Sequence, residues 1–385
     1  MKNKIARKIT TYLVLSLVYL ILTEVILSAF DPEQVFVKSY DDQMLFTMYP
    51  NKKGIVISEE YKVSVQTNEF GGRQNLAFEN YPILLMGDSF SEGWGVEESE
   101  TFTSVANKLL SEEMQIRNMG VHGSCPSLMY IHLQKYITLF KPKKVFLQLF
   151  DNDLDDIEKF EPFMNLHEGR PSPKKPVFAR MAGTYLYNQV KESSIFRLLK
   201  RATKFIKGGV EPILYFKEGR EPKISQLSHQ ESLVKYGTLL PLGEEISKKY
   251  NGQFEFYLKP SEKQWKTRLE KELHYLNLIY NLLKDQQIEL GIIYIPAKEF
   301  FAKGGILGLE KNQSIKNLES INPHFQNITK FCDTNKISCL NTTSLLWDKK
   351  PEDLYFPYDA HWNRKGHETF GKIFALEIQK SFPLK

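Results

Sequence analysis

The sequence predicts an α/β protein, with a central parallel sheet covered by helices on both faces and one transmembrane helix before it. Two observations carry this prediction. From residue 81 onward, short apolar runs alternate with segments of helical spacing, which is the pattern of strands joined by helices in a parallel sheet. Residues 1–30 instead combine a basic start with a long apolar run, which is typical of a membrane-spanning helix.

The N-terminal apolar run extends from residue 9 to residue 30 and follows Lys2, Lys4, Arg7 and Lys8. Its 22 residues, at ~1.5 Å per residue, span a hydrocarbon core of about 30 Å. Because basic residues stay in the cytoplasm, we expect everything after residue 30 outside it. A cleaved signal peptide is the alternative, but this run exceeds the usual signal core of about 7–15 residues. Leu27 also spoils the small-residue pattern expected before a cut after Ala29.

Three regions follow from the changes in composition along the chain. Residues 1–30 form the cytoplasmic tip and signal-anchor, and residues 31–80 form an extension with a β-hairpin from the β-prone runs 55–57 and 61–65. Residues 81–385 form the main domain, interrupted at about 155–262 by an insertion rich in Lys, Glu, Pro and Gly. The expected strands are 83–86, 116–121, 144–150, 288–295 and 337–341, and the expected helices are 101–114, 127–140, 262–286 and 363–380.

The overall composition is that of an ordinary globular protein, with 42% hydrophobic and 25% charged residues. The net charge is only +5, and the basic residues are scattered among nearly as many acids. A nucleic-acid-binding protein more often concentrates its positive charge on one face. We therefore expect no nucleic-acid partner.

The cysteine count is three, which is odd for an exported protein. Cys332 and Cys339 are close enough in sequence to bridge a helix end to the following strand, which would leave Cys125 over. Three unpaired buried thiols are the alternative, because a bridge needs Cα atoms within roughly 7 Å.

A candidate nucleophile, Ser89, lies in Gly87-Asp88-Ser89-Phe90, directly after the first expected strand of the sheet. Ligands bind at the carboxyl ends of parallel strands, and a serine after a flexible glycine can present its hydroxyl there on a tight turn. Gly, Asp and Ser are also the residues that any turn favours, so this segment alone is weak evidence.

A second cluster, Asp359-Ala-His361-Trp-Asn363, immediately precedes the last expected helix. A serine hydroxyl needs a base to remove its proton, and the imidazole needs a carboxylate to hold its tautomer. We therefore assign Ser89, His361 and Asp359 to a catalytic triad. The alternative, in which Asn363 simply caps the helix beside Asp359, leaves His361 unexplained.

Two further strand ends offer donors for an oxyanion. Asn118-Met-Gly-Val-His-Gly123 follows the second strand, and Asp151-Asn152-Asp153 follows the third. The backbone N–H groups of Ser89 and Gly123 and the side-chain amide of Asn152 are the expected oxyanion hole, which needs donors about 2.7–3.1 Å from the oxyanion.

A divalent cation site is one interpretation of the four acids that follow the third strand, Asp151, Asp153, Asp155 and Asp156. Their spacing fits no loop ligand pattern, so we expect a solvated loop at the strand end. The chain also lacks a glycine-rich phosphate loop and a dinucleotide fingerprint. We expect neither a metal nor a cofactor.

Together these blocks resemble the SGNH (GDSL-like) hydrolase family, whose four signature residues lie on separate strand ends. The resemblance covers residues 81–154 and about 266–380, and it implies a three-layer, flavodoxin-like α/β/α sandwich in which Ser89, Gly123, Asn152 and His361 take the four roles. The Asp-x-His-Trp form resembles the branch that acts on exported polysaccharides, including alginate O-acetylation proteins, with the acid two residues before the histidine. Two departures are Tyr358, where the family's commonest spacing has the acid, and Asp151, where many members have glycine.

The expected function is that of a membrane-anchored, extracytoplasmic serine esterase that acts on an acylated carbohydrate or lipid through an acyl-serine. An O-acyltransferase of exported polysaccharide would use the same triad with a sugar hydroxyl in place of water. A catalytically silent glycan-binding or assembly protein with this fold is the alternative of a different class.

Overall fold

The computed structural model describes residues 2–30, 38–57, 60–73, 81–206, 263–297, 322–346, 353–356, 359 and 361–381. Of the expected extension, residues 31–37, 58–59 and 74–80 lie outside this part of the chain. Of the expected insertion, residues 207–262 also lie outside it.

The centre of the fold is a five-stranded sheet in which all neighbours are parallel. Its strands are β5 (Ile83–Met86), β6 (Ile116–Asn118), β7 (Lys144–Phe150), β10 (Glu289–Ile295) and β11 (Ser338–Asn341). Their spatial order is β11-β10-β7-β5-β6, so the second strand lies outside the first and the later strands extend the other edge. This is the flavodoxin-like order, and it confirms the predicted fold class. The chain reverses direction across the sheet between β5 and β7, where such folds bind their ligands.

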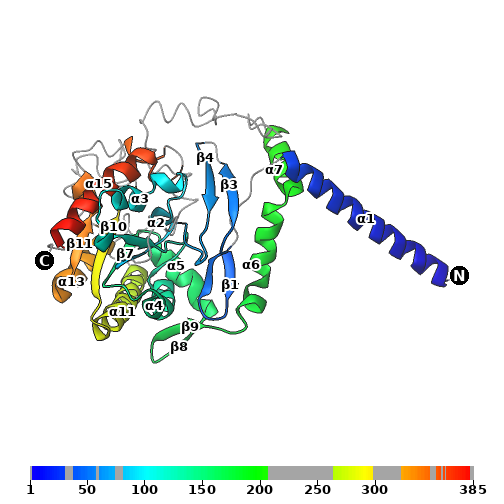
Figure 1. Ribbon diagram of the computed structural model, residues 1–385. Helices are drawn as coiled ribbons and strands as arrows, with labels where there is room; N and C mark the ends of the chain where they lie inside the picture. Colours follow the sequence, from blue (N-terminus) through cyan, green and yellow to red (C-terminus); the bar gives the residue numbers. More distant parts are fainter. Residues whose placement is uncertain are drawn as a thin grey trace.

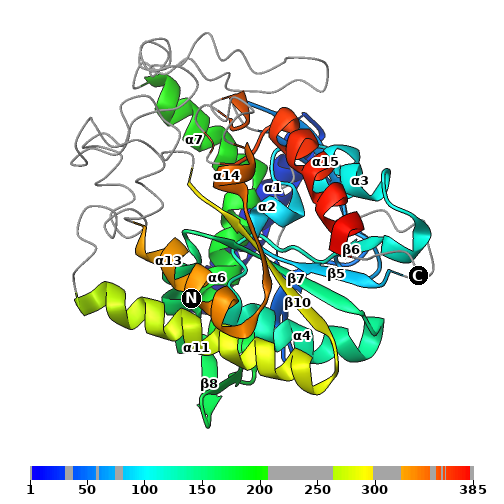
Figure 2. The ribbon, with the colours of Figure 1, turned by 90° about the vertical axis from the view of Figure 1, so that its left-hand side faces the viewer.

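Helices cover both faces of the sheet (Figure 2). One face packs against α3 (Phe102–Asn107), α14 (Thr342–Leu346) and α15 (Arg364–Ser381). The other face packs against α4 (Pro126–Phe140), α11 (Lys263–Asp285) and α13 (Pro323–Asn335). Successive residues of β5 show why both layers are needed: Ile83 and Leu85 belong to the first core and Leu84 and Met86 to the second.

Two expected boundaries are wrong, and side-chain hydrogen bonds explain both. The helix expected over 101–114 ends as α3 at Asn107, because the Asn107 side chain pairs with the backbone N–H and C=O of Ile116 and turns the chain toward β6. A short 3₁₀ helix, η2 (Glu112–Met114), fills the connection. The strand expected to reach residue 121 ends at Asn118, whose side chain accepts a bond from the Gly120 N–H at 2.9 Å and folds the chain into a turn.

The extension contains two antiparallel hairpins, β1 (Lys38–Asp41) with β2 (Leu45–Met48) and β3 (Lys53–Ile57) with β4 (Lys62–Gln66). The second is the hairpin expected from the sequence. These strands lie between the sheet domain and helix α6 (Val177–Glu192) (Figure 1). Their buried residues form a third core with α4 and with α5 (Asp153–Phe160), so the extension packs against the domain as part of its structure.

The first part of the expected insertion, up to residue 206, forms helices and a hairpin. It contains α5 (Asp153–Phe160), the 3₁₀ helix η3 (Glu161–Phe163), and the hairpin of β8 (Met164–His167) with β9 (Arg170–Pro173). Helices α6 (Val177–Glu192) and α7 (Ser194–Ile206) follow. The short 3₁₀ helix η1 (Glu98–Glu100) and helix α2 (Ser89–Glu92) lie earlier, between β5 and α3.

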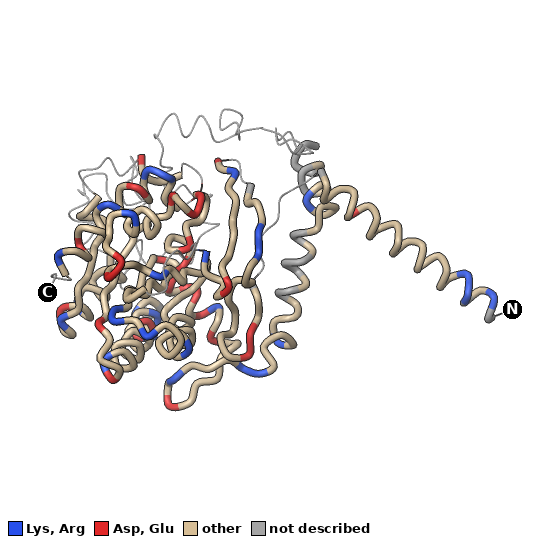
Figure 3. The backbone as a smooth tube through the Cα atoms, viewed as in Figure 1, with Lys and Arg blue, Asp and Glu red and all other residues tan. Residues whose placement is uncertain are grey.

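The N-terminal helix α1 (Lys2–Phe30) projects away from the rest of the molecule (Figure 1). Its stretch Arg7–Ala29 is 23 residues long with a mean hydropathy of 2.1, and none of it is buried. Figure 3 shows its basic residues gathered at the free end of the helix. The helix is therefore long and apolar enough to cross a membrane.

Cys332, near the end of α13, and Cys339, in β11, form a disulfide with Cα atoms 6.2 Å apart. The bridge closes the connection from helix to strand, so the alternative of three unpaired thiols is wrong. Cys125 is a buried free thiol.

Candidate active site

Ser89 begins helix α2, three residues after the end of the central strand β5. The Asp88 carboxylate caps this helix by accepting a 2.8 Å bond from the Phe90 N–H. Gly87 has no room for a side chain, because an added Cβ would meet the side chains of Ser91 and Gln148. The sequence Gly-Asp-Ser therefore builds a tight turn that carries the serine out of the sheet.

Gln148 of β7 fixes this turn from the neighbouring strand. Its side-chain carbonyl accepts bonds from the backbone N–H of Asp88 at 3.1 Å, the N–H of Ser91 at 3.2 Å and the Ser91 hydroxyl at 2.9 Å. Gln148 is fully buried. One side chain thus ties β7 to the turn and helix that follow β5, and restricts where the Ser89 hydroxyl can lie.

His361 and Asp359 reach Ser89 from the loop before α15. His361 Nε2 lies 2.6 Å from Ser89 Oγ, and His361 Nδ1 bonds Asp359 Oδ1 on the opposite side of the ring. The His361 N–H also donates to Asp359 Oδ1 at 3.1 Å. Because the carboxylate holds the proton on Nδ1, Nε2 is left as the acceptor for the serine hydroxyl. The three residues expected to form a triad are therefore in contact in the order serine, histidine, carboxylate.

The extension supplies two contacts to Asp359 that the sequence did not predict. The Tyr61 hydroxyl donates to Asp359 Oδ2 at 2.9 Å, and Glu60 Oε2 accepts from the Asp359 N–H at 2.5 Å. Glu60 and Tyr61 lie immediately before β4. The β-prone residues predicted the hairpin of β3 and β4. No local sequence pattern indicates which distant loop a hairpin will contact.

The pKa values of the pair are shifted in opposite directions. Burial disfavours the charged form of Asp359, but the charge of His361 and hydrogen bonds from His361 and Tyr61 outweigh it, and the pKa of Asp359 falls to about 2. Burial also disfavours the imidazolium of His361, yet the Asp359 carboxylate raises the pKa of His361 above its ordinary value. Asp359 is thus ionised at neutral pH and stabilises a proton on His361, as a triad requires.

The expected oxyanion donors lie on the strands that flank Ser89 in the sheet. Gly123 follows β6 and has φ +70°, in a turn closed by a 2.9 Å bond from the Ser124 N–H to the Val121 carbonyl. Asn152 follows β7, and its Nδ2 donates to Asp156 Oδ2 at 3.1 Å. An amide nitrogen carries two hydrogens, so this bond fixes Asn152 and leaves a second donor. The strand order brings Ser89, Gly123 and Asn152 to one sheet edge, and their role as an oxyanion hole stays a prediction.

The expected solvated loop of acids after β7 is wrong, because Asp151 and Asp153 are buried. Asp153 accepts from the Phe150 N–H at 3.0 Å, and burial together with the nearby Asp88 charge raises its pKa well above the ordinary value. Burial also raises the pKa of Asp88 to about 7. Among the described residues, no group of three or more His, Cys, Asp or Glu side chains is arranged to hold a metal ion.

Asp151 belongs to a buried network with His324 of α13 at its centre. His324 Nδ1 lies 3.0 Å from Asp151 Oδ1, and Nε2 lies 2.6 Å from Glu272 Oε1 of α11. The Tyr294 hydroxyl also donates to Asp151 at 2.6 Å. Burial lowers the pKa of His324, but the neighbouring Glu272 and Asp151 side chains outweigh it and raise this pKa to about 10, which favours the protonated ring. This network ties the residue before Asn152 to two helices of the sheet's second face.

A second histidine–carboxylate pair lies on the β6 side of Ser89. His122 Nδ1 lies 2.8 Å from Glu92 Oε2, and the His122 N–H donates to the same oxygen at 2.6 Å. The Trp94 ring contacts both histidines, with centroids 5.3 Å from His122 and 6.2 Å from His361. The sequence alone indicates no role for His122, Glu92 or Trp94, although His122 directly precedes Gly123.

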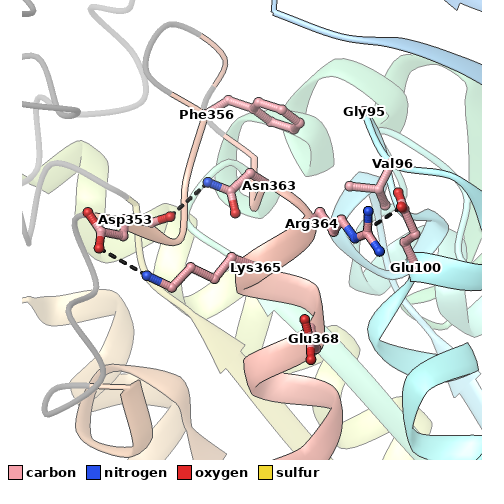
Figure 4. A pocket seen from close by; sticks show the side chains of 9 residues that line it. All are labelled: Gly95, Val96, Glu100, Asp353, Phe356, Asn363, Arg364, Lys365 and Glu368. Carbon is pink, nitrogen blue, oxygen red and sulfur yellow. Dashed lines mark hydrogen bonds and ion pairs between the residues drawn. The ribbon is translucent and has the colours of Figure 1, made fainter.

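A cavity of about 420 Å³ lies beside the triad loop and is drawn in Figure 4. Its wall includes Phe356, whose N–H donates to the His361 carbonyl at 2.9 Å, and the ion pair of Arg364 with Glu100 at 3.2 Å. Neither Ser89 nor His361 lines it. The cavity therefore borders the loop that carries His361 and Asp359, and it is not the space in which a group bonded to Ser89 would lie.

Comparisons with known proteins add similarity of structure only. No protein-family model matches the chain. No curated protein sequence matches it either. Similar solved structures include one described as a lipolytic protein of the G-D-S-L family from Desulfitobacterium hafniense, at 10% identity and a TM-score of 0.38, covering 77% of this chain and 99% of that one.

Two further structures are described as esterases. The acetyl xylan esterase AlAXEase has a TM-score of 0.37 at 10% identity and covers 77% of this chain and 98% of its own. A carbohydrate acetylesterase family member from Sinorhizobium meliloti has a TM-score of 0.36 at 10% identity, with 78% and 99% covered. Likeness this distant identifies neither the family of this chain nor its substrate.

Proposed function

We propose that this protein is a serine esterase that acts through an acyl-serine on Ser89. The observation that supports the proposal most is the 2.6 Å contact of His361 Nε2 with Ser89 Oγ, with Asp359 bonded to the other ring nitrogen. A half-buried, ionised carboxylate behind a histidine has a clear use when the histidine must take a proton from a serine.

The reaction follows from the roles of these atoms. His361 Nε2 accepts the Ser89 proton while Oγ attacks the ester carbonyl and forms a tetrahedral intermediate. His361 then gives that proton to the departing alcohol, and the C–O bond of the ester breaks. Water enters, loses a proton to His361 and attacks the acyl-serine. The bond from the acyl carbon to Oγ then breaks, His361 returns the proton to Oγ, and the carboxylic acid leaves with Ser89 restored. The N–H groups of Ser89 and Gly123 and the second Asn152 hydrogen are the proposed donors to the oxyanion.

The second half of the reaction decides between hydrolase and transferase. If a sugar hydroxyl replaces water, the same residues carry out O-acyl transfer to an exported polysaccharide, in line with the resemblance of Asp359-x-His361-Trp362 to that branch. We propose hydrolysis of an acylated carbohydrate or lipid as the primary function and acyl transfer as the second candidate.

The proposed location is a membrane, with the catalytic domain on the extracytoplasmic side. The apolar length of α1 supports a single span, and its basic N-terminal end supports a cytoplasmic N-terminus. The disulfide between Cys332 and Cys339 is of the kind that persists in oxidising compartments.

Labelling of the full chain with a fluorophosphonate tests the proposal, because this reagent reacts only with an activated serine. We expect wild type to be labelled and Ser89→Ala and His361→Ala to lose both labelling and hydrolysis of p-nitrophenyl acetate. Ser104→Ala is the matched control, since it removes a serine hydroxyl that bonds Glu98 and belongs neither to the triad nor to the turn held by Gln148, and it should remain labelled. An unlabelled wild type would favour the catalytically silent binding protein, and a labelled Ser89→Ala would assign the nucleophile elsewhere.

A further inference from the structure

Glu24, near the end of α1, holds the start of helix α7. Its carboxylate accepts bonds from the Ser194 N–H at 2.5 Å, the Ile195 N–H at 3.1 Å and the Ser193 hydroxyl at 2.8 Å. The first N–H groups of a helix have no partners within that helix, so Glu24 satisfies donors that would otherwise need water. Since α1 is the candidate span, this contact fixes the height of α7 relative to a bilayer.

The depth of Glu24 follows from its place in the apolar stretch. The middle of Arg7–Ala29 is Val18, and Glu24 is six residues beyond it. Six residues of helix rise by ~9 Å, whereas half of a hydrocarbon core is about 15 Å. Centred in a bilayer, α1 therefore places Glu24 and the start of α7 roughly 6 Å inside the core's outer boundary, which is the depth at which interfacial helices lie.

Burial at this depth is costly for a carboxylate and for unpaired backbone N–H groups alike. The contact of Glu24 with α7 reduces both costs, because the carboxylate and the N–H groups bond to each other. The carboxylate in the apolar part of α1 thus has a specific partner in the protein. This is the first reason to place α7 at the membrane boundary instead of in water.

The composition of α7 is the second reason. Its sequence, SIFRLLKRATKFI, contains four Lys or Arg residues and no Asp or Glu, with apolar residues at the spacing of one helix face. Arg197 is buried, so the basic residues that count toward an anionic surface are the three that follow it in the sequence, Lys200, Arg201 and Lys204. Leu199 of α7 is 59% exposed, and on α6 Leu186 and Val190, one turn apart, are 62% and 52% exposed. Basic, amphipathic helices with exposed apolar residues bind at the surface of anionic bilayers.

The packing of α6 connects this surface to the catalytic domain. Val177 and Met181 of α6 are buried in the core that also contains Tyr61 and the β1–β4 hairpins. Figure 1 shows α1 leaving from the α7 end while α6 runs across the direction of α1, as a helix lying along the bilayer surface would.

We propose that α6 and α7 lie on the surface of the anionic phospholipid bilayer that α1 spans, with Leu186, Val190 and Leu199 in its acyl boundary. The proposal rests on the membrane anchoring put forward under the proposed function, and it adds a fixed orientation. The catalytic domain is held against the membrane through α6 instead of swinging from a flexible tether.

The test uses four variants of the full chain, Leu186→Cys, Leu199→Cys, Leu20→Cys and Leu376→Cys. Each is labelled with the fluorophore NBD in nanodiscs of phosphatidylcholine and phosphatidylglycerol. The native cysteines do not compete, because Cys125 is buried and the other two form a disulfide. Leu376 of α15 is the matched control, since it is 56% exposed on a different face. Lipids with a nitroxide near the headgroup should quench NBD at residues 186 and 199 several-fold more than at 376, and iodide in water should show the reverse order.

Each other outcome decides against the proposal in a distinguishable way. If NBD at residue 20 is protected from iodide by lipid while residues 186 and 199 behave like 376, α1 is anchored and the α6–α7 contact is wrong. If both quenchers fail at 186 and 199, protein covers this surface instead of lipid. If residue 20 is quenched by iodide as strongly as 376, the anchoring itself fails. Substitution of Glu24 tests the contact with α7 directly. In Glu24→Ala, which removes the bonds to the start of α7, NBD at residue 199 should lose quenching by the lipid nitroxide while NBD at residue 20 keeps it. Glu24→Gln retains a side-chain oxygen that can accept those bonds, so its quenching should be closer to that of wild type.

Discussion

The hydroxyl of Tyr61 donates a hydrogen bond of 2.9 Å to Oδ2 of Asp359, across 298 residues of sequence. His361 occupies the other oxygen of the same carboxylate. Asp359 is therefore held on both sides, by the histidine it orients and by the N-terminal hairpin. The extension is part of the candidate site, and the orientation of the carboxylate depends on how β4 packs.

Tyr61→Phe should lower kcat without unfolding the protein. A hydrogen bond to a charged group contributes about 1.5–3 kcal/mol, and losing part of it from the orientation of Asp359 should reduce kcat roughly 10-fold. Hydrolysis of p-nitrophenyl acetate by the full chain measures this. Tyr275→Phe is the matched control, because the Tyr275 hydroxyl also donates to a carboxylate, Glu161, at 3.0 Å. Equal kcat in both variants would mean that Tyr61 does not position the acid.

Asp359→Asn should lower kcat by up to roughly 10⁴-fold, because the amide favours the wrong imidazole tautomer. The pH profile should also change. His361 must be neutral to accept the serine proton, and the Asp359 charge raises its pKa, so kcat/KM of wild type should fall as pH drops through that raised pKa. Without the charge, the acidic midpoint of the variant should move to lower pH. A variant with normal kcat, alongside an inactive Asp88→Asn, would give the role of the acid to Asp88.

The stability of the protein should fall between about pH 6.5 and pH 10 because of His324. Its pKa is raised to about 10 in the folded state, against about 6.5 unfolded. A raised pKa contributes stability that is complete below the unfolded value and lost as pH rises through the folded one. Thermal unfolding of the full chain should therefore show a midpoint that declines over this range.

His324→Gln is the comparison that isolates this contribution. It leaves Asp151 and Glu272 buried without their cation, which should lower the free energy of unfolding by about 3–5 kcal/mol at pH 7. The decline with pH should be weaker in the variant than in wild type. Parallel pH curves for the two proteins would show that His324 is not protonated in the fold.

The sheet could be predicted from sequence because its strands are buried on both faces. Ile83–Met86 and Lys144–Phe150 are strands with the predicted bounds, since every residue in them is buried and apolar or paired. The end of α3 could not be predicted, because Asn107 ends it through a bond to Ile116, a residue in the next strand. This bond forms only when β6 lies beside Asn107, so the spacing of apolar residues along the helix cannot predict where the helix ends.

The candidate site divides in the same way. Ser89 and His361 were predictable because a strand end and a short polar loop carry unusual residues for their position. Gln148, Glu60 and Tyr61 were not, because each acts through a contact that only the packed fold creates. The prediction that Asp151 is solvated is wrong. A run of acidic residues is typical of an exposed loop, and the sequence does not indicate that His324, from a distant helix, contacts Asp151.

The candidate site should lie on the extracytoplasmic side of the membrane. The basic residues at the start of α1 and the acidic residues Asp31 and Glu33 after its apolar stretch favour a cytoplasmic N-terminus. Alkaline phosphatase folds only outside the cytoplasm of a bacterial host, whereas a green fluorescent reporter exported by the general pathway stays dark. Fused after Tyr40, the phosphatase should be active and the fluorescent protein dark. Replacing Lys2, Lys4, Arg7 and Lys8 by Glu is the control, and it should weaken this difference because those charges set the orientation. The opposite pattern in the unaltered chain would place Ser89 in the cytoplasm and remove exported polymers from its possible substrates.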